Sequence, residues 1–235
     1  MKQLSPRMLV NRFSQKWRLT GVDGLTTMKM KSATVLLDLT QSEEDLWKAV
    51  HSKNRWSVRK ARKKGVTFHE GGDHDECYDL YRKMCAINLV APIPRHILFQ
   101  LGRLFTAKLD GQVVAFSVIV EDQAKKRAVH EINASDYETR ETQANSLLYW
   151  EFIRAYQDRG FQEIDLGGID LHAEFNEGPD RFKKRWGGQV SAREHDVGIL
   201  HYAWWRYLRH HRSLRVMKMQ VQMLGQSVRR LSGRP

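Results

Sequence analysis

The sequence predicts a mixed α/β fold in which helices flank one central sheet. Short β-type runs alternate with segments of helical periodicity, and three β-type runs follow one another in the middle of the chain. The composition of the 235 residues, 41% hydrophobic and 28% charged, is typical of a globular domain. No run of 18 apolar residues occurs and the N-terminus lacks the apolar core of a signal peptide, so we expect neither a membrane span nor export.

The first 90 residues are expected to hold two strands and three helices. Residues 1–32 are basic and weakly patterned, and we interpret them as an extension or a partial strand. Thr40 with Glu43 fits a capping box, Gly65 ends the second helix, and Pro92 stands just beyond the third. The predicted elements are a strand at 33–39, a helix that begins near residue 40, a helix at 54–64, a strand at 66–70 and a helix at 73–89.

The rest of the chain continues the alternation. Asp110-Gly111 is a strong hairpin signal between two β-type runs. Apolar residues from Leu214 to Leu231 recur in a coiled-coil-like pattern, which predicts a basic C-terminal helix packed on the protein itself, on a membrane surface or on a partner. The predicted elements are strands at 104–109, 113–121 and 127–134, a helix at 144–159, a strand at 161–169, a short basic helix or turn at 178–186, a strand at 188–197 and a helix beyond residue 200.

Positive charge is concentrated in two segments that contain no acidic residue. The chain holds 39 Lys and Arg against 27 Asp and Glu, a formal net charge of +12. Residues 51–64 contribute seven of the basic residues and residues 201–235 contribute eight, which leaves 24 basic against 27 acidic residues elsewhere. Such segments attract the phosphates of nucleic acids, nucleotides or membrane surfaces, unless they are only solvated helix faces.

The sequence lacks the motifs of the common covalent and metal-dependent mechanisms. It has no P-loop, no Gly-x-Gly-x-x-Gly, no Cys-x-x-Cys, no His-Glu-x-x-His and no Gly-x-Ser-x-Gly, and we predict no metal site. Cys77 and Cys85 stand about 12 Å apart on one predicted helix, roughly twice the reach of a disulfide, so we expect free thiols in a reducing compartment. The chemistry that remains needs only positioning and charge stabilisation.

Four segments of the chain carry a family resemblance. The most specific is GPDRFKKRWGG at 178–188, and the others are LDLTQSEEDLWKAVHSKNRWSVRKARKKGV at 37–66, Ala134-Ser135, and LLYWEFIRAYQDRGFQEIDLGGI at 147–169. Together they resemble the FemABX family, the aminoacyl-tRNA-dependent enzymes that add amino acids to peptidoglycan precursors. The resemblance implies a GNAT-like acyltransferase fold for residues 33–200, with residues 1–32 as an N-terminal extension and residues 201–235 as a basic helical tail.

Two departures limit what the resemblance implies. GNAT enzymes that use acyl-CoA carry a turn of the form Arg/Gln-x-x-Gly-x-Gly/Ala, whose amides hold the pyrophosphate at a helix N-terminus. The corresponding residues 140–146, RETQANS, contain no glycine, which argues against a standard acetyl-CoA enzyme. FemABX proteins have two acetyltransferase-like domains and a helical hairpin proposed to contact tRNA, whereas this chain has the length for one such domain. The transfer chemistry is therefore expected to carry over, while the acceptor stays open.

The resemblance also implies a catalytic lysine. In the family the Lys of the Phe-Lys pair is placed to stabilise the oxyanion that forms when an amine attacks an ester, and it matches Lys183. Phe182 would position this lysine by packing, and Arg181 is a candidate phosphate ligand. Gly167 and Gly168 mark a place where the backbone comes close to a substrate or to a neighbouring strand.

Further substrate-binding candidates lie on the basic helix and at a strand end. Arg55 and Arg59, one turn apart, would hold the pyrophosphate of a precursor or the acceptor stem of a tRNA, and we expect them to face Lys183 across a cleft. Trp56 beside them either stacks on a base or belongs to the core. Asp165 is either a general base for the attacking amine or a structural carboxylate. The weaker candidates are His130, Glu131 and His172.

We therefore expect an acyltransferase of FemABX type that transfers an aminoacyl group to an amine of a cell-envelope or peptidoglycan precursor. No cofactor is expected beyond the co-substrate, aminoacyl-tRNA or acyl-CoA. The expected partners are tRNA and a nucleotide- or lipid-linked precursor, with membrane contact through the basic tail and a dimer as further options for a cytoplasmic protein. The alternatives are an acyl-CoA-dependent N-acyltransferase of the GNAT superfamily and a non-enzymatic module that binds RNA or anionic lipid, for which no cleft is expected.

Overall fold

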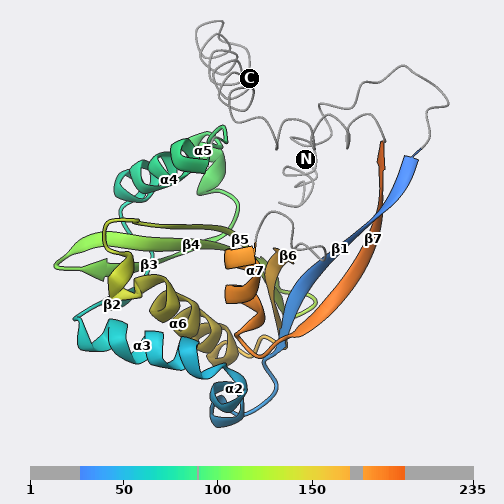
Figure 1. The fold of residues 1–235 in the computed structure, drawn as a ribbon, viewed down its shortest axis with the longest axis horizontal. Coiled ribbons are helices and arrows are strands. Elements are labelled where there is room, and N and C mark those ends of the chain that lie inside the picture. The colour runs from blue at the N-terminus through green and yellow to red at the C-terminus, as the bar shows by residue number, and fades with distance from the viewer. Residues whose placement is uncertain (1–26, 89, 170–176, 199–235) are drawn as a thin grey trace, which may run out of the picture.

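A computed structural model describes residues 27–88, 90–169 and 177–198 of the chain (Figure 1). In these ranges seven strands form one sheet in the order β2-β3-β4-β5-β6-β1-β7. The strands are β1 (Thr27–Asp38), β2 (Thr67–Glu70), β3 (Arg103–Leu109), β4 (Gln112–Asp122), β5 (Arg127–Ser135), β6 (Glu163–Ile169) and β7 (Gln189–Gly198). The helices are α2 (Glu43–Ala49), α3 (Ser52–Lys63), α4 (His74–Asn88), α5 (Arg95–Leu98), α6 (Ala144–Asp158) and α7 (Glu177–Lys184), with a 3-10 helix, η1 (Arg140–Thr142).

The sheet is antiparallel except between β5 and β6, which run parallel. The pairing of β5 with β6 runs only from Arg127 opposite Glu163 to Val129 opposite Asp165. Beyond these pairs β5 continues to Ser135 and β6 to Ile169, both inside the described ranges, without pairing to each other. The two strands therefore form a fork that opens toward their C-terminal ends.

Two hydrophobic clusters hold the helices on the two faces of the sheet. Alternate residues of β3 show the division, because Phe105 and Ala107 belong to the cluster with α2, α3 and α6, whereas Leu104 belongs to the cluster with α4. Figure 1 shows α3 and α6 on one side of the sheet and α4 and α5 on the other. Phe152 and Tyr156 of α6 are fully buried, and their rings contact Phe105 of β3.

The predicted fold class, a mixed sheet flanked by helices, is confirmed by this architecture. Asp110 and Gly111 both have positive φ, +50° and +82°, as a two-residue hairpin of this kind requires. Gly65 follows the end of α3 with a φ of +80°, the left-handed conformation that commonly ends a helix. These turns agree with the sequence because the residue types they need are few.

Three local features differ from the sequence prediction. β1 begins at Thr27, before the expected start at residue 33, because residues 27–36 pair with β7. Ser42, rather than Thr40, caps α2 with its hydroxyl group. The short helix α5 begins after Pro94, in a segment for which the sequence analysis predicted only a break.

The expected C-terminal tail and its seam from Leu214 to Leu231 lie outside the described residues. In the part of the chain that the structure describes, no helix is long and apolar enough to cross a membrane. Cys77 and Cys85 of α4 are free and buried, and burial raises the pKa of the Cys77 thiol to about 12. A thiol of that kind is unreactive, so these residues serve the packing of α4.

Candidate active site

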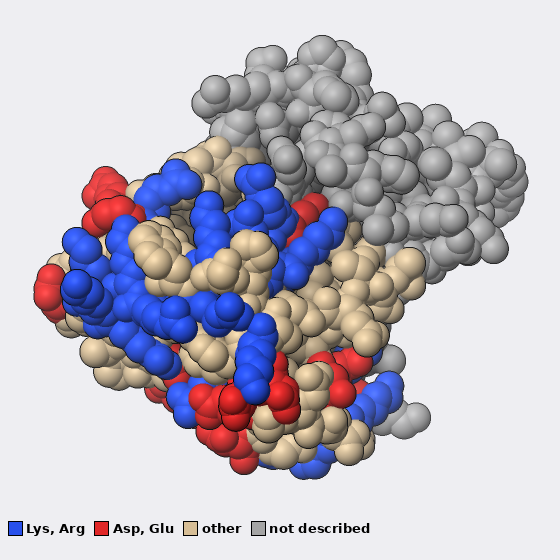
Figure 2. Space-filling model, turned by 60° about the horizontal axis from the view of Figure 1, so that its bottom comes forward, with Lys and Arg blue, Asp and Glu red and all other residues tan. Residues whose placement is uncertain are grey.

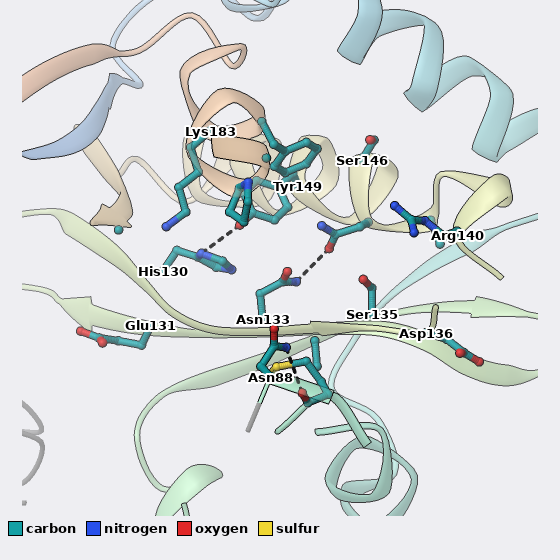
Figure 3. A pocket seen from close by; sticks show the side chains of 18 of the residues that line it. Asn88, His130, Glu131, Asn133, Ser135, Asp136, Arg140, Ser146, Tyr149 and Lys183 are labelled. Atoms are coloured by element: carbon teal, nitrogen blue, oxygen red, sulfur yellow. Dashed lines mark hydrogen bonds between the residues drawn. The ribbon is translucent and has the colours of Figure 1, made fainter. Parts of the chain in front are cut away.

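A pocket of about 920 Å³ opens in the fork between β5 and β6. Its walls come from the unpaired ends of these two strands, the first turn of α6, helix α7 and the C-terminal end of α4. Figure 3 shows two basic side chains at opposite ends of the pocket, Lys183 at one and Arg140 at the other. The site is thus a consequence of topology, because strands that stop pairing leave space between them.

Lys183 extends from α7 into the pocket. Its ammonium group donates a hydrogen bond of 2.9 Å to the carbonyl oxygen of Gly168. Burial lowers the pKa of Lys183, while the carboxylates of Asp180 and Asp165 oppose this shift. The cation is partly buried, and a negative charge that forms beside it would be stabilised.

The two glycines of β6 allow the lysine to lie against the strand. Gly167 has a φ of +84°, and a Cβ at this position would stand 3.3 Å from the Nζ of Lys183 and 3.1 Å from the carbonyl oxygen of His130. A Cβ on Gly168 would meet only the carbonyl oxygen of Ala33, at 3.9 Å. Gly167 therefore makes room for the lysine, and Gly168 supplies the oxygen that holds it.

Asp165 is buried at the base of the fork and is held by structural contacts. Its Oδ2 accepts a hydrogen bond of 2.8 Å from Arg127, and its Oδ1 accepts from the amide of Gly167 at 2.9 Å and from the hydroxyl of Thr34. These bonds join β5, β6 and β1 and fix the turn at Gly167. Of the two roles considered for Asp165, general base and structural carboxylate, these contacts favour the structural one, since both carboxylate oxygens already accept hydrogen bonds.

His130 of β5 forms part of the pocket wall beside Lys183 (Figure 3). Its Nδ1 lies 3.2 Å from the hydroxyl of Tyr149, its Nε2 lies 3.0 Å from the hydroxyl of Ser117, and its ring stacks on Phe152. Burial, reinforced by the charge of Lys183, lowers the pKa of His130 to about 3. The imidazole is therefore neutral near pH 7 and adds no second positive charge to the site.

An aromatic cluster fixes the helix that carries the lysine. The ring of Phe182 meets Tyr149 edge to face, with centroids 4.9 Å apart, and meets Trp186 in the same way at 5.7 Å. Trp186 is 1% exposed and stacks on Tyr149 at 5.7 Å. Contacts of this kind stabilise by about 1 kcal/mol each beyond the burial itself. They hold α7 in one rotation about its axis and so aim Lys183 at the fork.

The opposite end of the pocket is the first turn of α6. Gln143 precedes this helix with φ 63° and ψ 25°, a left-handed conformation that is uncommon without glycine. Its side-chain oxygen accepts a hydrogen bond of 3.0 Å from Ser57 of α3, and its side-chain amide donates to the carbonyl of Arg140. The first turn of α6 contains no acidic residue. A helix N-terminus beside an arginine suits an anionic group such as a phosphate.

Amide side chains line the middle of the pocket, and the sequence analysis missed them. Asn133 of β5 donates a hydrogen bond of 2.8 Å to the side-chain oxygen of Asn145 in α6 (Figure 3). The available signal was the alternation along β5, where the polar residues 131, 133 and 135 are separated by Ile132 and Ala134 and all three line the pocket. Among the described residues, no group of three or more His, Cys, Asp or Glu side chains is arranged to hold a metal ion.

Arg55 and Arg59, which were expected to face Lys183 across a cleft, do not line the pocket, and neither does the candidate phosphate ligand Arg181. Arg55 instead donates to carbonyl oxygens at the C-terminal end of α2, the nearest being that of Val50 at 2.5 Å. Arg59 lies over the ring of Trp47, with 5.7 Å from guanidinium carbon to ring centroid. The carbonyls at a helix end lack helical partners and attract a cation, which explains the contacts of Arg55 with the end of α2.

Residues 94–184 match the family model described as an acetyltransferase (GNAT) domain. This stretch begins at the end of the segment before α5 and includes β3 to β6, α6 and Lys183. The match and the mixed sheet together establish a GNAT-like fold for this part of the chain. No significant match was found among curated proteins.

Solved structures with the same fold include FemX, with a TM-score of 0.59, 15% identity and coverage of 73% of this chain and 63% of that chain. The C-terminal domain of a protein assigned as a lysylphosphatidylglycerol synthetase from Agrobacterium fabrum has a TM-score of 0.57 and 14% identity, and the match covers 77% of this chain and 65% of that chain. The structure of L-PGS from Bacillus licheniformis has a TM-score of 0.56 and 11% identity, with coverage of 73% of this chain and 61% of that chain. At these identities the similarity concerns the fold, and the chain spans less than two thirds of each of the three structures.

Proposed function

We propose that the protein is an acyltransferase of FemABX type, which transfers an aminoacyl group from aminoacyl-tRNA to an amine of a cell-envelope precursor. The observation that carries the proposal is the ammonium group of Lys183 in the fork pocket, bonded to the carbonyl of Gly168 and next to the neutral His130. The pocket itself disfavours the non-enzymatic alternative, for which no cleft is expected.

The proposed reaction is the aminolysis of an ester. The acceptor nitrogen attacks the ester carbonyl carbon, a C–N bond forms, and the carbonyl electron pair moves onto oxygen. The intermediate collapses when the C–O bond to the ribose breaks, and the proton lost by the nitrogen is taken up by the leaving ribose oxygen. The ammonium of Lys183 would stabilise the intermediate oxyanion, an effect of about 3 kcal/mol for one well-placed donor.

The amine can attack as its free base, so the proposal requires no protein carboxylate as general base. This agrees with Asp165, whose oxygens are engaged by Arg127, Thr34 and the Gly167 amide. The electrostatics also agree, because the low pKa of His130 means that this ring adds no positive charge beside Lys183. Arg140 and the first turn of α6 would receive a phosphate of the donor at the other end.

The similar structures support an aminoacyl donor, since FemX is one of them and the C-terminal domain of a protein assigned as a lysylphosphatidylglycerol synthetase is another. Because the chain spans less than two thirds of either structure, the acceptor is part of the proposal. We propose an amine on a nucleotide- or lipid-linked precursor, met at the inner face of the membrane. A hydroxyl of a lipid headgroup is the acceptor that the second neighbour's name suggests, and the assay includes it.

A second candidate function is acyl transfer from acyl-CoA, and one observation favours it. Gln143 has the left-handed backbone conformation that glycine commonly supplies, so the turn before α6 forms even without glycine. The amides of this turn and Arg140 would then hold a pyrophosphate, as in other GNAT enzymes. Donor competition in one assay separates the two candidates.

The test is a transfer assay with tRNA charged with radiolabelled amino acids, an extract of lipid-linked precursors and, in parallel, phosphatidylglycerol vesicles. We expect label in the precursor, abolished by RNase and unchanged by added acetyl-CoA. Lys183→Met should lower kcat by about 10²- to 10³-fold. Lys184→Met is the matched control, because Lys184 is exposed, one residue further along α7, and does not line the pocket.

Other results of the transfer assay would change the proposed donor, the proposed acceptor or the proposed role of Lys183. RNase-resistant transfer that follows an acyl-CoA donor supports the second candidate. Label in the vesicles, and not in the precursor, changes the acceptor to a lipid. Equal activity of Lys183→Met and Lys184→Met contradicts the proposed role of Lys183.

A further inference from the structure

The exposed side of α3 combines an aromatic ring with unpaired positive charge. Trp56 is 54% exposed, so the core placement considered for it does not apply. The Nζ of Lys60 lies 5.0 Å from the centroid of its ring. Helix α3 contains no acidic residue, and Figure 2 shows Lys and Arg side chains gathered over the face that comes forward from below the view of Figure 1, where α3 lies.

The basic residues of α3 divide into two groups with different surroundings. The arginines are engaged: Arg55 caps α2, Arg59 covers the ring of Trp47, and Arg62 pairs with Glu151 at 2.6 Å. The lysines differ, because no ion pair within the described residues involves them. They are Lys53, Lys60, Lys63 and the C-cap residue Lys64. The positive charge available to a ligand on α3 is therefore carried by lysines.

Helical geometry places these lysines in a row. Lys53, Lys60 and Lys64 are separated by seven and four residues, so they lie on one side of the helix over about 16 Å of its length. Ser57 falls between Lys53 and Lys60 on the same side and donates its hydroxyl to Gln143, which lines the pocket. This hydrogen bond joins the side of α3 that carries the lysine row to the pocket wall at the N-terminal end of α6.

We propose that this surface, Lys53, Trp56, Lys60 and Lys64, binds an RNA strand whose acylated end enters the fork pocket. The inference rests on the proposed function, because it names the surface that the tRNA donor would use. A row of lysines attracts a strand that carries a phosphate on every nucleotide. An exposed indole beside them offers a face on which any base can stack.

An anionic membrane is the other polyanion that such charge attracts, and the apolar content of α3 argues against it. A helix that lies in a membrane interface buries a broad apolar face. On α3 the apolar residues Val58 and Ala61 are fully buried in the core, so Trp56 is the one large apolar side chain that its exposed side presents. A single ring suits stacking on a base better than insertion into lipid.

The test measures binding of uncharged bulk tRNA to the full chain by fluorescence anisotropy over a range of salt concentrations. Lys53→Gln/Lys60→Gln should weaken binding roughly tenfold or more at 0.1 M salt and lower the slope of log Kd against log salt by about 2. Trp56→Ala should weaken binding at least about fivefold, and Trp56→Phe should restore most of the loss because it keeps a stacking ring. Lys83→Gln/Lys125→Gln is the matched control, since both lysines are exposed and lie outside α3, and this double substitution removes the same number of positive charges.

Binding of Lys53→Gln/Lys60→Gln equal to that of the control pair overturns the proposal. The proposal is also overturned if the variant loses binding only to vesicles of phosphatidylglycerol and phosphatidylcholine, because the surface would then bind membranes. The transfer assay separates this failure from that of the proposed function. If transfer depends on tRNA but the KM for charged tRNA is unchanged in Lys53→Gln/Lys60→Gln, the proposed RNA surface is wrong and the proposed function stands. If transfer does not depend on tRNA, the proposed donor is wrong, and the tRNA affinities of the variants alone decide whether α3 binds RNA.

Discussion

Acidification is expected to destabilise the protein through His130, a side chain that the fold keeps neutral. The ring is enclosed between Phe152, Tyr149 and Ser117, and its pKa is lowered to about 3. In the unfolded chain the pKa of a histidine is about 6.5. Between these two values the unfolded state binds a proton that the folded state does not, so the free energy of unfolding decreases as the pH falls.

The magnitude follows from the two pKa values. Between pH 7 and pH 4.5 this linkage removes about 2.5 kcal/mol from the free energy of unfolding, and any folded pKa well below 4.5 has nearly the same effect. The stabilisation is present above pH 6.5 and is lost progressively below it. For a domain of this size such a loss is a substantial part of the total stability.

The assay is urea unfolding at pH 7 and pH 4.5 for the unmodified chain and for His130→Gln. Glutamine keeps a donor and an acceptor for Tyr149 and Ser117 but does not titrate. Other groups titrate equally in both proteins, so the pH-dependent loss should be about 2.5 kcal/mol smaller in the variant. An identical loss in both proteins would refute a buried, neutral His130.

Two further predictions concern the supports of the pocket. Arg127→Leu removes the ion pair of 2.8 Å to the buried Asp165 and should lower the free energy of unfolding by about 3–5 kcal/mol in urea titrations, whereas a loss under about 1 kcal/mol would contradict the structural role of Asp165. Gly187→Ala should cost about 2–4 kcal/mol, because φ is +83° and the new Cβ would stand 2.7 Å from the carbonyl oxygen of Ala49. Gly65→Ala, with φ +80° and nothing within 4 Å, is its control and should cost only about 1–2 kcal/mol, so equal thermal shifts would contradict the steric argument.

Local patterns in the sequence were sufficient for most elements of the fold. Residues 144–159 were predicted as a helix from apolar spacing, and α6 covers Ala144–Asp158. The Asp110-Gly111 turn was predicted from two residues whose backbone preference is strong. The cap of α2 was misplaced by two residues, because Thr40, Ser42 and several acids in one short segment offer alternative caps that only the path of the chain distinguishes.

The candidate site was predictable only in part. The motif at 178–188 pointed to Lys183, and the tertiary structure brings its amine to Gly168, in a pocket lined by β5, β6 and α6. Arg55 and Arg59 of α3 were expected to face Lys183 across the same cleft. Their guanidinium groups instead meet the C-terminal end of α2 and the ring of Trp47.

The sequence by itself determined the alternation of elements, the turns and the segments that carry positive charge, because each depends on residues close together in the chain. Only the tertiary structure decided where the pocket opens, since the fork depends on β5 and β6 losing their pairing after Val129 and Asp165. It also decided that His130 is neutral and that the lysines of α3, rather than its arginines, are available to a ligand. Burial, long-range hydrogen bonds and strand order are properties of segments distant in sequence, and no local pattern encodes them.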